Sequence, residues 1–169
     1  MYYICLIMNK LSFIPVLIFT LFVAIHANAQ TVTDSTQVIQ KKYQAKAPPT
    51  QPFGAEAFQS SGKTILRWLG MGGYLINSRG TTLMVDPLLG GFDMPIMIDF
   101  PIAAKNVPRL DAVLVTHADN DHYSVPTNKE LKPVTRIFHS TVYVDSLMKN
   151  EGFPSAGHNI GDTFHIGPV

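Results

Sequence analysis

From residue 64 onward the chain begins with three short runs of β-branched, aromatic and other apolar residues, each ended by a turn signal. The runs cover residues 64–69, 74–77 and 81–85, and this composition is typical of strands. The glycine-rich segment 70–73 and the Ser-Arg-Gly sequence at 78–80 separate them and favour tight turns. The pattern therefore predicts an antiparallel meander.

Longer connections follow the meander. A continuous apolar run predicts a buried strand over residues 110–116, and further strands are expected over 134–138 and 163–166. Helical periodicity predicts short helices over 124–131 and from 140 or 141 to 150. A meander that passes into strand–helix–strand units indicates a layered α/β domain.

Residues 88–108 form a long segment rich in proline, methionine and isoleucine, without a regular period. Long loops of this kind often border a functional site. Packing against the sheet is an equally good interpretation, and the sequence leaves both open.

The first 29 residues are almost entirely apolar, with Lys10 as their only charge. A long apolar run follows Lys10 and ends at the small-residue site Ala27-Asn-Ala29, which predicts a secretory signal peptide over residues 1–29. A retained N-terminal anchor is the alternative. Cys5 is the only cysteine, so a chain processed at this site has no thiol for disulfides or metal binding.

Residues 30–62 are rich in Gln, Ser, Thr, Ala, Lys and Pro, which predicts a flexible spacer before a domain over residues 63–169. The chain has 13 basic and 12 acidic residues and no basic cluster, which argues against nucleic-acid binding. No run after residue 29 is long enough to span a membrane. We expect an exported protein, periplasmic or secreted, with no membrane span after signal cleavage; nothing indicates its oligomeric state.

Four potential metal ligands lie within six residues directly after the predicted strand 110–116. They are His117, Asp119, Asp121 and His122. Imidazole and carboxylate groups suit a borderline cation such as zinc, and a loop allows ligands of such close spacing to converge. A metal held there would lower the pKa of bound water to around 7 and polarise a substrate carbonyl, while a neighbouring carboxylate could orient or deprotonate the water.

A purely structural interpretation of the same loop is also available. Asp121 could accept hydrogen bonds from the free amides at the start of the predicted helix 124–131, with His117 merely hydrogen-bonded.

Three segments together resemble the metallo-β-lactamase superfamily. The closest similarity is to the branch of ascorbate-6-phosphate lactonases and N-acyl-phosphatidylethanolamine phospholipases D. The segments are Gly70-Met-Gly-Gly-Tyr74, Thr82-Leu-Met-Val-Asp86-Pro87 and the stretch from Asp111 to His122. The resemblance covers residues 63–169 in the family's order of elements, as the N-terminal half of such a domain.

The resemblance implies a four-layer αββα sandwich with one or two divalent metal ions between the sheet edges. By position, His117 is a ligand of the first metal, and Asp121 and His122 belong to the second. Asp121 also positions the attacking hydroxide, which makes it the expected catalytic residue. Asp86 matches a family residue that does not bind the metal itself but orients the metal ligands.

Two departures from the family pattern change these expectations. Asp119 stands where the family has a second histidine, so zinc remains the expected metal but manganese or iron becomes an alternative. The family takes its other ligands from a second half that these residues do not supply, so we expect a domain truncated to its first half. His139, His158 and His165 match no ligand position and are expected to be structural or exposed to solvent.

The first hypothesis is therefore an exported metal-dependent hydrolase that attacks a lactone, phosphodiester or amide bond of a small-molecule or lipid-like substrate with metal-bound hydroxide. We expect this truncated chain to be inactive. The alternative is a non-catalytic metal-binding or interaction domain that keeps the fold without a complete site.

Overall fold

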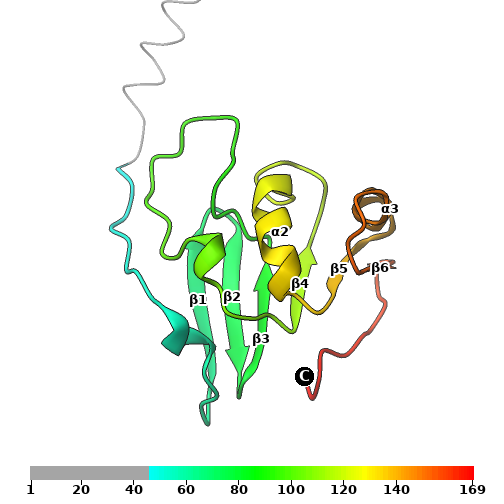
Figure 1. The fold of residues 1–169 in the computed structure, drawn as a ribbon, viewed down its shortest axis with the longest axis horizontal. Coiled ribbons are helices and arrows are strands. Elements are labelled where there is room, and N and C mark those ends of the chain that lie inside the picture. Colours follow the sequence, from blue (N-terminus) through cyan, green and yellow to red (C-terminus); the bar gives the residue numbers. More distant parts are fainter. Residues whose placement is uncertain (1–45) are drawn as a thin grey trace, which may run out of the picture. The chain divides into compact units, whose positions relative to one another are not determined.

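The computed structural model describes residues 46–169 (Figure 1). The predicted signal peptide and the first part of the predicted spacer lie outside the described residues. The secondary structure consists of η1 (Ala55–Phe58), β1 (Thr64–Gly70), β2 (Gly73–Ser78), β3 (Thr81–Val85), η2 (Ala104–Asn106), β4 (Ala112–Val115), α2 (Val125–Leu131), η3 (Lys132–Val134), β5 (Phe138–Thr141), α3 (Val142–Asn150) and β6 (Ser155–His158).

All six strands form one mixed sheet, and their order in the sheet is their order in the sequence. The β1–β2 and β2–β3 pairs are antiparallel, as the meander predicts. Strands β3, β4, β5 and β6 run parallel to one another. The turn between β2 and β3 uses positive φ angles at Arg79 (55°) and Gly80 (99°), which suit a two-residue hairpin. The predicted α/β class is confirmed.

The main hydrophobic core lies between one face of the sheet and the two α-helices. In Figure 1, α2 lies over the sheet, and α3 lies beside β5 and β6. Leu75 and Met84 from the meander, Phe138 from β5, and Leu131 and Met148 from the helices are all fully buried in this core. The shared core fixes the parallel strands against their crossover helices.

The opposite face of the sheet carries a second, smaller apolar cluster. Its buried members are Leu83, Ala112 and Ile166, and further apolar side chains pack against it from the strands. The residues described here contain one sheet with helices on one face, so they show one half of the expected sandwich. No helix among residues 46–169 is both long and apolar enough for a membrane span.

The strand predictions after the ligand loop were partly wrong. The strand expected over 134–138 begins only at Phe138, because α2 continues into η3 and uses residues up to Val134. Residues 163–166 form no strand. The last strand is instead β6, whose sequence Ser-Ala-Gly-His has weak intrinsic preference for a strand. It forms through its pairing with β5 over four residues.

The part of the predicted spacer that the structure describes packs against the domain. Ala57 and Phe58 belong to the main core, and the buried Asn77 side chain donates hydrogen bonds to the carbonyls of Ala57 (2.9 Å) and Gln59 (2.8 Å). The hydrophobic core therefore includes residues that precede position 63. Within residues 46–62 the only regular element is the short helix η1, and the proline-rich composition of this segment carries no information about burial.

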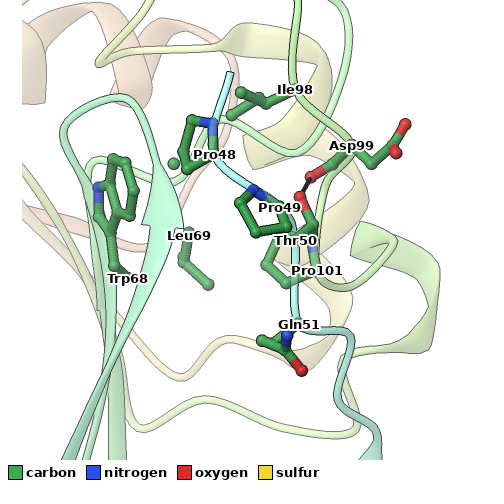
Figure 2. A pocket seen from close by; sticks show the side chains of 10 residues that line it. Pro48, Pro49, Thr50, Gln51, Trp68, Leu69, Ile98, Asp99 and Pro101 are labelled. Carbon is green, nitrogen blue, oxygen red and sulfur yellow. Dashed lines mark hydrogen bonds between the residues drawn. The ribbon is translucent and has the colours of Figure 1, made fainter. Parts of the chain in front are cut away.

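The beginning of this segment contacts the long loop that follows β3. The Thr50 hydroxyl donates to the carbonyl of Asp99 (2.6 Å), and Pro48 and Pro49 line a cavity of about 170 Å³ together with Trp68 (Figure 2). Residues 48–51 thus lie against the end of β1.

The two ends of the loop 88–108 pack against the domain, whereas its middle is exposed. Its ends contribute Leu89, Ile102, Ala104 and Val107 to the main core. The Leu89 amide donates to the Thr127 hydroxyl of α2 (3.1 Å). The sequence left open whether this loop borders a functional site or packs against the sheet. The two ends of the loop pack against the domain.

Candidate metal centre

The ligand loop directly follows β4, and Asp86 directly follows β3. Because β3 and β4 are parallel and adjacent, their carboxyl ends meet at one edge of the sheet. The Asp86 amide continues the pairing by donating to the carbonyl of Leu114 (2.9 Å). Parallel pairing therefore brings together residues that are some thirty positions apart in the sequence.

The Asp86 carboxylate is buried and accepts three hydrogen bonds from the loop. Its Oδ1 accepts from the Thr116 amide (2.7 Å) and its Oδ2 from the Thr116 hydroxyl (2.7 Å). The Nδ1 atom of His122 lies 2.9 Å from the same Oδ2. The Asp86 backbone has a positive φ of 42°, a left-handed conformation that aspartate tolerates better than most residues. One side chain thus anchors both ends of the ligand loop.

This anchor fixes the tautomers of both histidines. A carboxylate only accepts hydrogen bonds, so the Nδ1 atom of His122 donates to Asp86. The Thr116 hydroxyl has one proton, which it donates to Asp86. It therefore accepts a hydrogen bond from Nδ1 of His117, which lies 2.9 Å away. In both rings Nδ1 therefore carries a proton. In the neutral form of each ring the lone pair is then on Nε2, as a metal ligand requires.

Each Nε2 atom faces a carboxylate of the same loop. His117 Nε2 lies 3.3 Å from Asp119 Oδ2, and His122 Nε2 lies 3.6 Å from Asp121 Oδ2. Two ligand atoms at about 2.1 Å from a tetrahedral ion lie about 3.4 Å apart, so both spacings fit donor pairs that share a cation. The donor set therefore fits the metal implied by the sequence.

The two donor pairs lie side by side, since the ring centroids of His117 and His122 are 4.0 Å apart. His117 pairs with Asp119, and His122 pairs with Asp121. Across residues 46–169, no three His, Cys, Asp or Glu side chains converge closely enough to form a ready metal site. The loop supplies two adjacent half-sites.

The helix-capping interpretation of Asp121 is not what the structure shows. Ser124 caps α2, and its side chain accepts from the amide of Thr127 (3.3 Å). The loop is closed instead by the carbonyl of Asp119, which accepts from the amides of His122 (2.9 Å) and Tyr123 (2.6 Å). The Asp121 side chain is free of this structural task.

Sequence reasoning missed two residues of this region. Thr116 links Asp86 to His117, as described above. Gly72, in the turn between β1 and β2, lies so close to the loop that a Cβ atom there would be 2.9 Å from Cε1 of His122. The sequence analysis used the glycine-rich turn as a strand boundary and as a family motif, although repeated glycines are also a signal of close backbone approach.

The other histidines lie outside the ligand loop. His139 in β5 is buried and hydrogen-bonded to His158 at the end of β6, with 2.8 Å between Nδ1 and Nε2. His165 is exposed in the segment after β6. None of the three joins the two donor pairs.

Comparison with known proteins agrees with this geometry. The family model of the metallo-beta-lactamase superfamily matches residues 73–125, which run from β2 through Asp86 and the ligand loop to the start of α2. Over these residues the chain is similar to metallo-beta-lactamase domains. The resemblance noted from the three sequence motifs is therefore confirmed. The ligand loop lies wholly inside the matched segment.

A curated relative of the chain is the UPF0173 metal-dependent hydrolase of Caldivirga maquilingensis. The two are 30% identical over 108 residues, which cover 62% of this chain and 41% of the relative. The chain thus spans less than half the length of this relative.

Among solved structures, the chain is similar to CmlA, a diiron beta-hydroxylase from Streptomyces venezuelae. The TM-score is 0.50 at 20% identity, and the match covers 62% of this chain and 22% of CmlA. The similarity supports the assignment of the fold.

Proposed function

We propose that this chain carries the metal-binding loop of a metal-dependent hydrolase. The observation that supports the proposal most strongly is the Asp86 anchor, which leaves the Nε2 lone pairs of both His117 and His122 free beside a carboxylate. A loop with only a structural role has no need for two histidines fixed in the same tautomer. The family match over residues 73–125 points to the same chemistry.

In this proposal the loop holds two divalent ions. His117 and Asp119 would bind the first, and Asp121 and His122 the second, with further ligands from outside the loop. We propose zinc as the metal, with manganese or iron as alternatives because Asp119 is a harder, charged ligand than histidine. Such an ion would lower the pKa of a bound water to about 7 and polarise the scissile bond.

Asp121 has the position of a water-orienting residue. Its side chain is about one third exposed, so it faces solvent as well as His122. A partly exposed carboxylate can accept a proton from an attacking water and release it to solvent. Asp86 is buried and takes no part in proton transfer; it orients the histidines. The bond attacked is proposed to be a lactone, phosphodiester or amide bond of a small-molecule or lipid-like substrate.

The decisive experiment measures bound metal and hydrolysis in the same preparations. Metal content by mass spectrometry is compared for the native chain, His117→Ala, Asp121→Asn and the control His165→Ala, which removes an exposed histidine outside the loop. Turnover on a lactone, a phosphodiester and an amide is measured in a full-length form of the protein, which also supplies the ligands from outside the loop. We expect lower metal content and lost turnover in the two loop variants only. Equal metal content and undiminished turnover in all four proteins would refute the proposal.

One observation favours a second function. The described residues provide two donor pairs but no set of three converging ligands. A chain that uses only these pairs would bind metal weakly and act as a non-catalytic metal-binding or interaction domain. Metal content that depends on His117 and Asp121 without any turnover supports this alternative.

We also propose that the protein is exported, to the periplasm or the medium. The proposal is supported by the charge-poor apolar sequence over residues 1–29 and by the small residues before Gln30. N-terminal sequencing of the protein from the producing cell tests it. A chain that begins at Gln30 is expected, whereas an intact N-terminus in a membrane fraction would favour a retained anchor.

A further inference from the structure

The cavity at the end of β1 is enclosed by three parts of the chain. Its volume is about 170 Å³, and its lining comes from the last residues of β1, from the segment 48–51 and from the loop between β3 and β4 (Figure 2). Phe53 and Phe100, which lie next to the lining in the latter two parts, pack against the main core on the helix side of the sheet. A second sheet on the opposite face would therefore not cover these two parts.

The walls of the cavity are mainly apolar. The Trp68 indole lies on one side and the rings of Pro49 and Pro101 lie on the other, and Leu69 and Ile98 complete the apolar lining (Figure 2). An apolar cavity of about 150 Å³ in another protein binds benzene, so a space of this size accommodates a ring or a hydrocarbon group of about six carbon atoms.

The polar groups of the lining are paired within the protein or directed away from the cavity. Trp68 Nε1 donates to the carbonyl of Met71 (3.0 Å), and the Thr50 hydroxyl donates to the carbonyl of Asp99 (2.6 Å). The Asp99 carboxylate points away from the other lining side chains (Figure 2), and Gln51 is exposed. The lining contains no lysine or arginine. A charged ligand group would find no partner there, and burying it would be costly.

A single glycine-rich turn separates the cavity from the candidate metal centre. Gly70 lines the cavity, and a Cβ atom at Gly72 would lie 2.9 Å from Cε1 of His122. Consecutive Cα atoms are about 3.8 Å apart and a Cα–Cβ bond is about 1.5 Å, so the wall at Gly70 lies within about 12 Å of the His122 ring. An extended chain advances about 1.2 Å per bond, so about ten bonds span this length.

We infer that this cavity binds the uncharged apolar end of the substrate, while the scissile bond lies at the metal centre on the other side of the turn. The inference rests on the proposed function, because it specifies the substrate of that site. It predicts a hydrocarbon arm that extends up to about ten bonds from the scissile bond and carries no charge at its end. Lipid-like substrates have such an arm, whereas compact polar substrates do not.

Trp68 is the only tryptophan of the chain, so its fluorescence reports directly on the cavity. The full chain is titrated with 1-hexanol, which is uncharged, and with hexanoate, an anion of the same chain length. We expect a saturable change of the Trp68 emission with 1-hexanol, and an affinity for hexanoate that is lower by about fivefold or more. Equal affinity for both compounds, or a change that does not saturate, would overturn the inference.

Two variants, each with a matched control, locate the binding. Ile98→Phe fills the cavity and Pro49→Ala removes part of one wall, so each is expected to weaken 1-hexanol binding by about threefold or more. Met97→Phe and Pro52→Ala make the same changes at exposed positions that do not line the cavity, and we expect native affinity in both. Equal affinity in each variant and its control would also overturn the inference. The Pro49 and Pro52 variants decide the question if circular dichroism shows that Ile98→Phe does not fold.

Failure of this inference can be distinguished from failure of the proposed function. Binding of 1-hexanol needs neither metal nor turnover, so binding that depends on Ile98, without hydrolysis of 4-nitrophenyl decanoate by a full-length form, supports the cavity and counts against the hydrolase. If that form is active, Ile98→Phe should lower the ratio of kcat/KM for the decanoate to kcat/KM for 4-nitrophenyl acetate by about threefold or more, relative to Met97→Phe. Hydrolysis that is lost in His117→Ala, with an equal ratio in the Ile98 and Met97 variants, supports the hydrolase and overturns the cavity.

Discussion

Asp86 and His122, separated by 36 residues, are joined by a hydrogen bond of 2.9 Å between Oδ2 and Nδ1 at the carboxyl edge of two parallel strands. The same oxygen accepts from the Thr116 hydroxyl, which in turn accepts from His117. A single buried carboxylate therefore orients both imidazoles of the loop. This arrangement separates the group that orients the ligands from the groups that would bind the metal.

The first prediction concerns this anchor. In Asp86→Asn one carboxylate oxygen becomes an amide nitrogen, so the side chain can no longer accept all three hydrogen bonds from the loop. Replacement of such supporting residues typically costs about 10–100-fold in metal affinity, and we expect a loss in this range, measured by competition with a chromophoric chelator. The loss of stability should be about 1–3 kcal/mol, measured by urea unfolding.

The control for this prediction is Asp111→Asn. The carboxylate of Asp111 also accepts backbone and hydroxyl hydrogen bonds, from the Thr82 amide (2.8 Å) and hydroxyl (3.3 Å), but it contacts no histidine. We expect this variant to lose stability without losing metal affinity. Equal metal affinity in the Asp86 and Asp111 variants would contradict the role of Asp86.

The second prediction concerns the turn between β1 and β2. A methyl group at position 72 would lie 2.9 Å from Cε1 of His122, so Gly72→Ala should displace the ring and lengthen its hydrogen bond to Asp86. We expect weaker metal binding, by about tenfold, since small displacements of supporting contacts have effects of that size. Gly62→Ala is the matched control, because a Cβ atom there has no neighbour within 4 Å. If both variants bind metal like the native chain, the turn does not position His122.

The sequence predicted the parts of the fold that depend on local signals. The three meander strands, the end of α3 at Asn150 and the placement of the ligand loop after β4 follow from turn residues, capping residues and apolar runs. Strand β6 was missed because Ser155–His158 has little strand preference and forms through pairing with β5. The burial of Phe58 was missed because it depends on tertiary packing. Such packing leaves no periodic pattern of apolar residues in the local sequence.

At the candidate site, the sequence identified the four loop residues and Asp86 but not the links between them. Thr116 can link Asp86 to His117 only because β3 and β4 are parallel neighbours. The spacing of these residues along the chain does not reveal this link. Gly72 is similar, since its contact with His122 exists only after the meander folds onto the loop. The ring stack of Phe164 with His139 and His158 likewise requires β5, β6 and the segment after β6 to meet.

The third prediction concerns the contact between the segment before β1 and the sheet. The buried Asn77 side chain donates to two carbonyls of the segment and accepts from the Gly80 amide (2.9 Å). Asn77→Ala removes all three hydrogen bonds and should lower the free energy of unfolding by about 2–3 kcal/mol. Urea unfolding measures this change, with Asn106→Ala, at an exposed position, as the control. A loss below about 0.5 kcal/mol would show that the segment is not held in this way.

The last prediction concerns the pH dependence of stability. Burial and the neighbouring His158 lower the pKa of His139 in the folded chain, whereas the unfolded chain keeps the ordinary value near 6.5. Protonation therefore favours the unfolded state. The contribution of His139 is fully present above pH 6.5 and is lost as the pH falls below 6.5 toward the lowered pKa of the folded state. We expect the free energy of unfolding to decrease between pH 7.5 and 5.5, measured by urea titration at each pH.

Substitution of His139 separates this effect from the titration of other groups. His139→Gln removes the titrating ring but keeps a hydrogen-bonding side chain toward His158, so the decrease between pH 7.5 and 5.5 should become smaller than in the native chain. His165→Gln, at an exposed position, should leave the decrease unchanged. If the His139 variant keeps the full pH dependence of the native chain, the buried histidine pair does not control stability in this range. If only this variant loses it, burial of His139 links the protonation of this ring to unfolding.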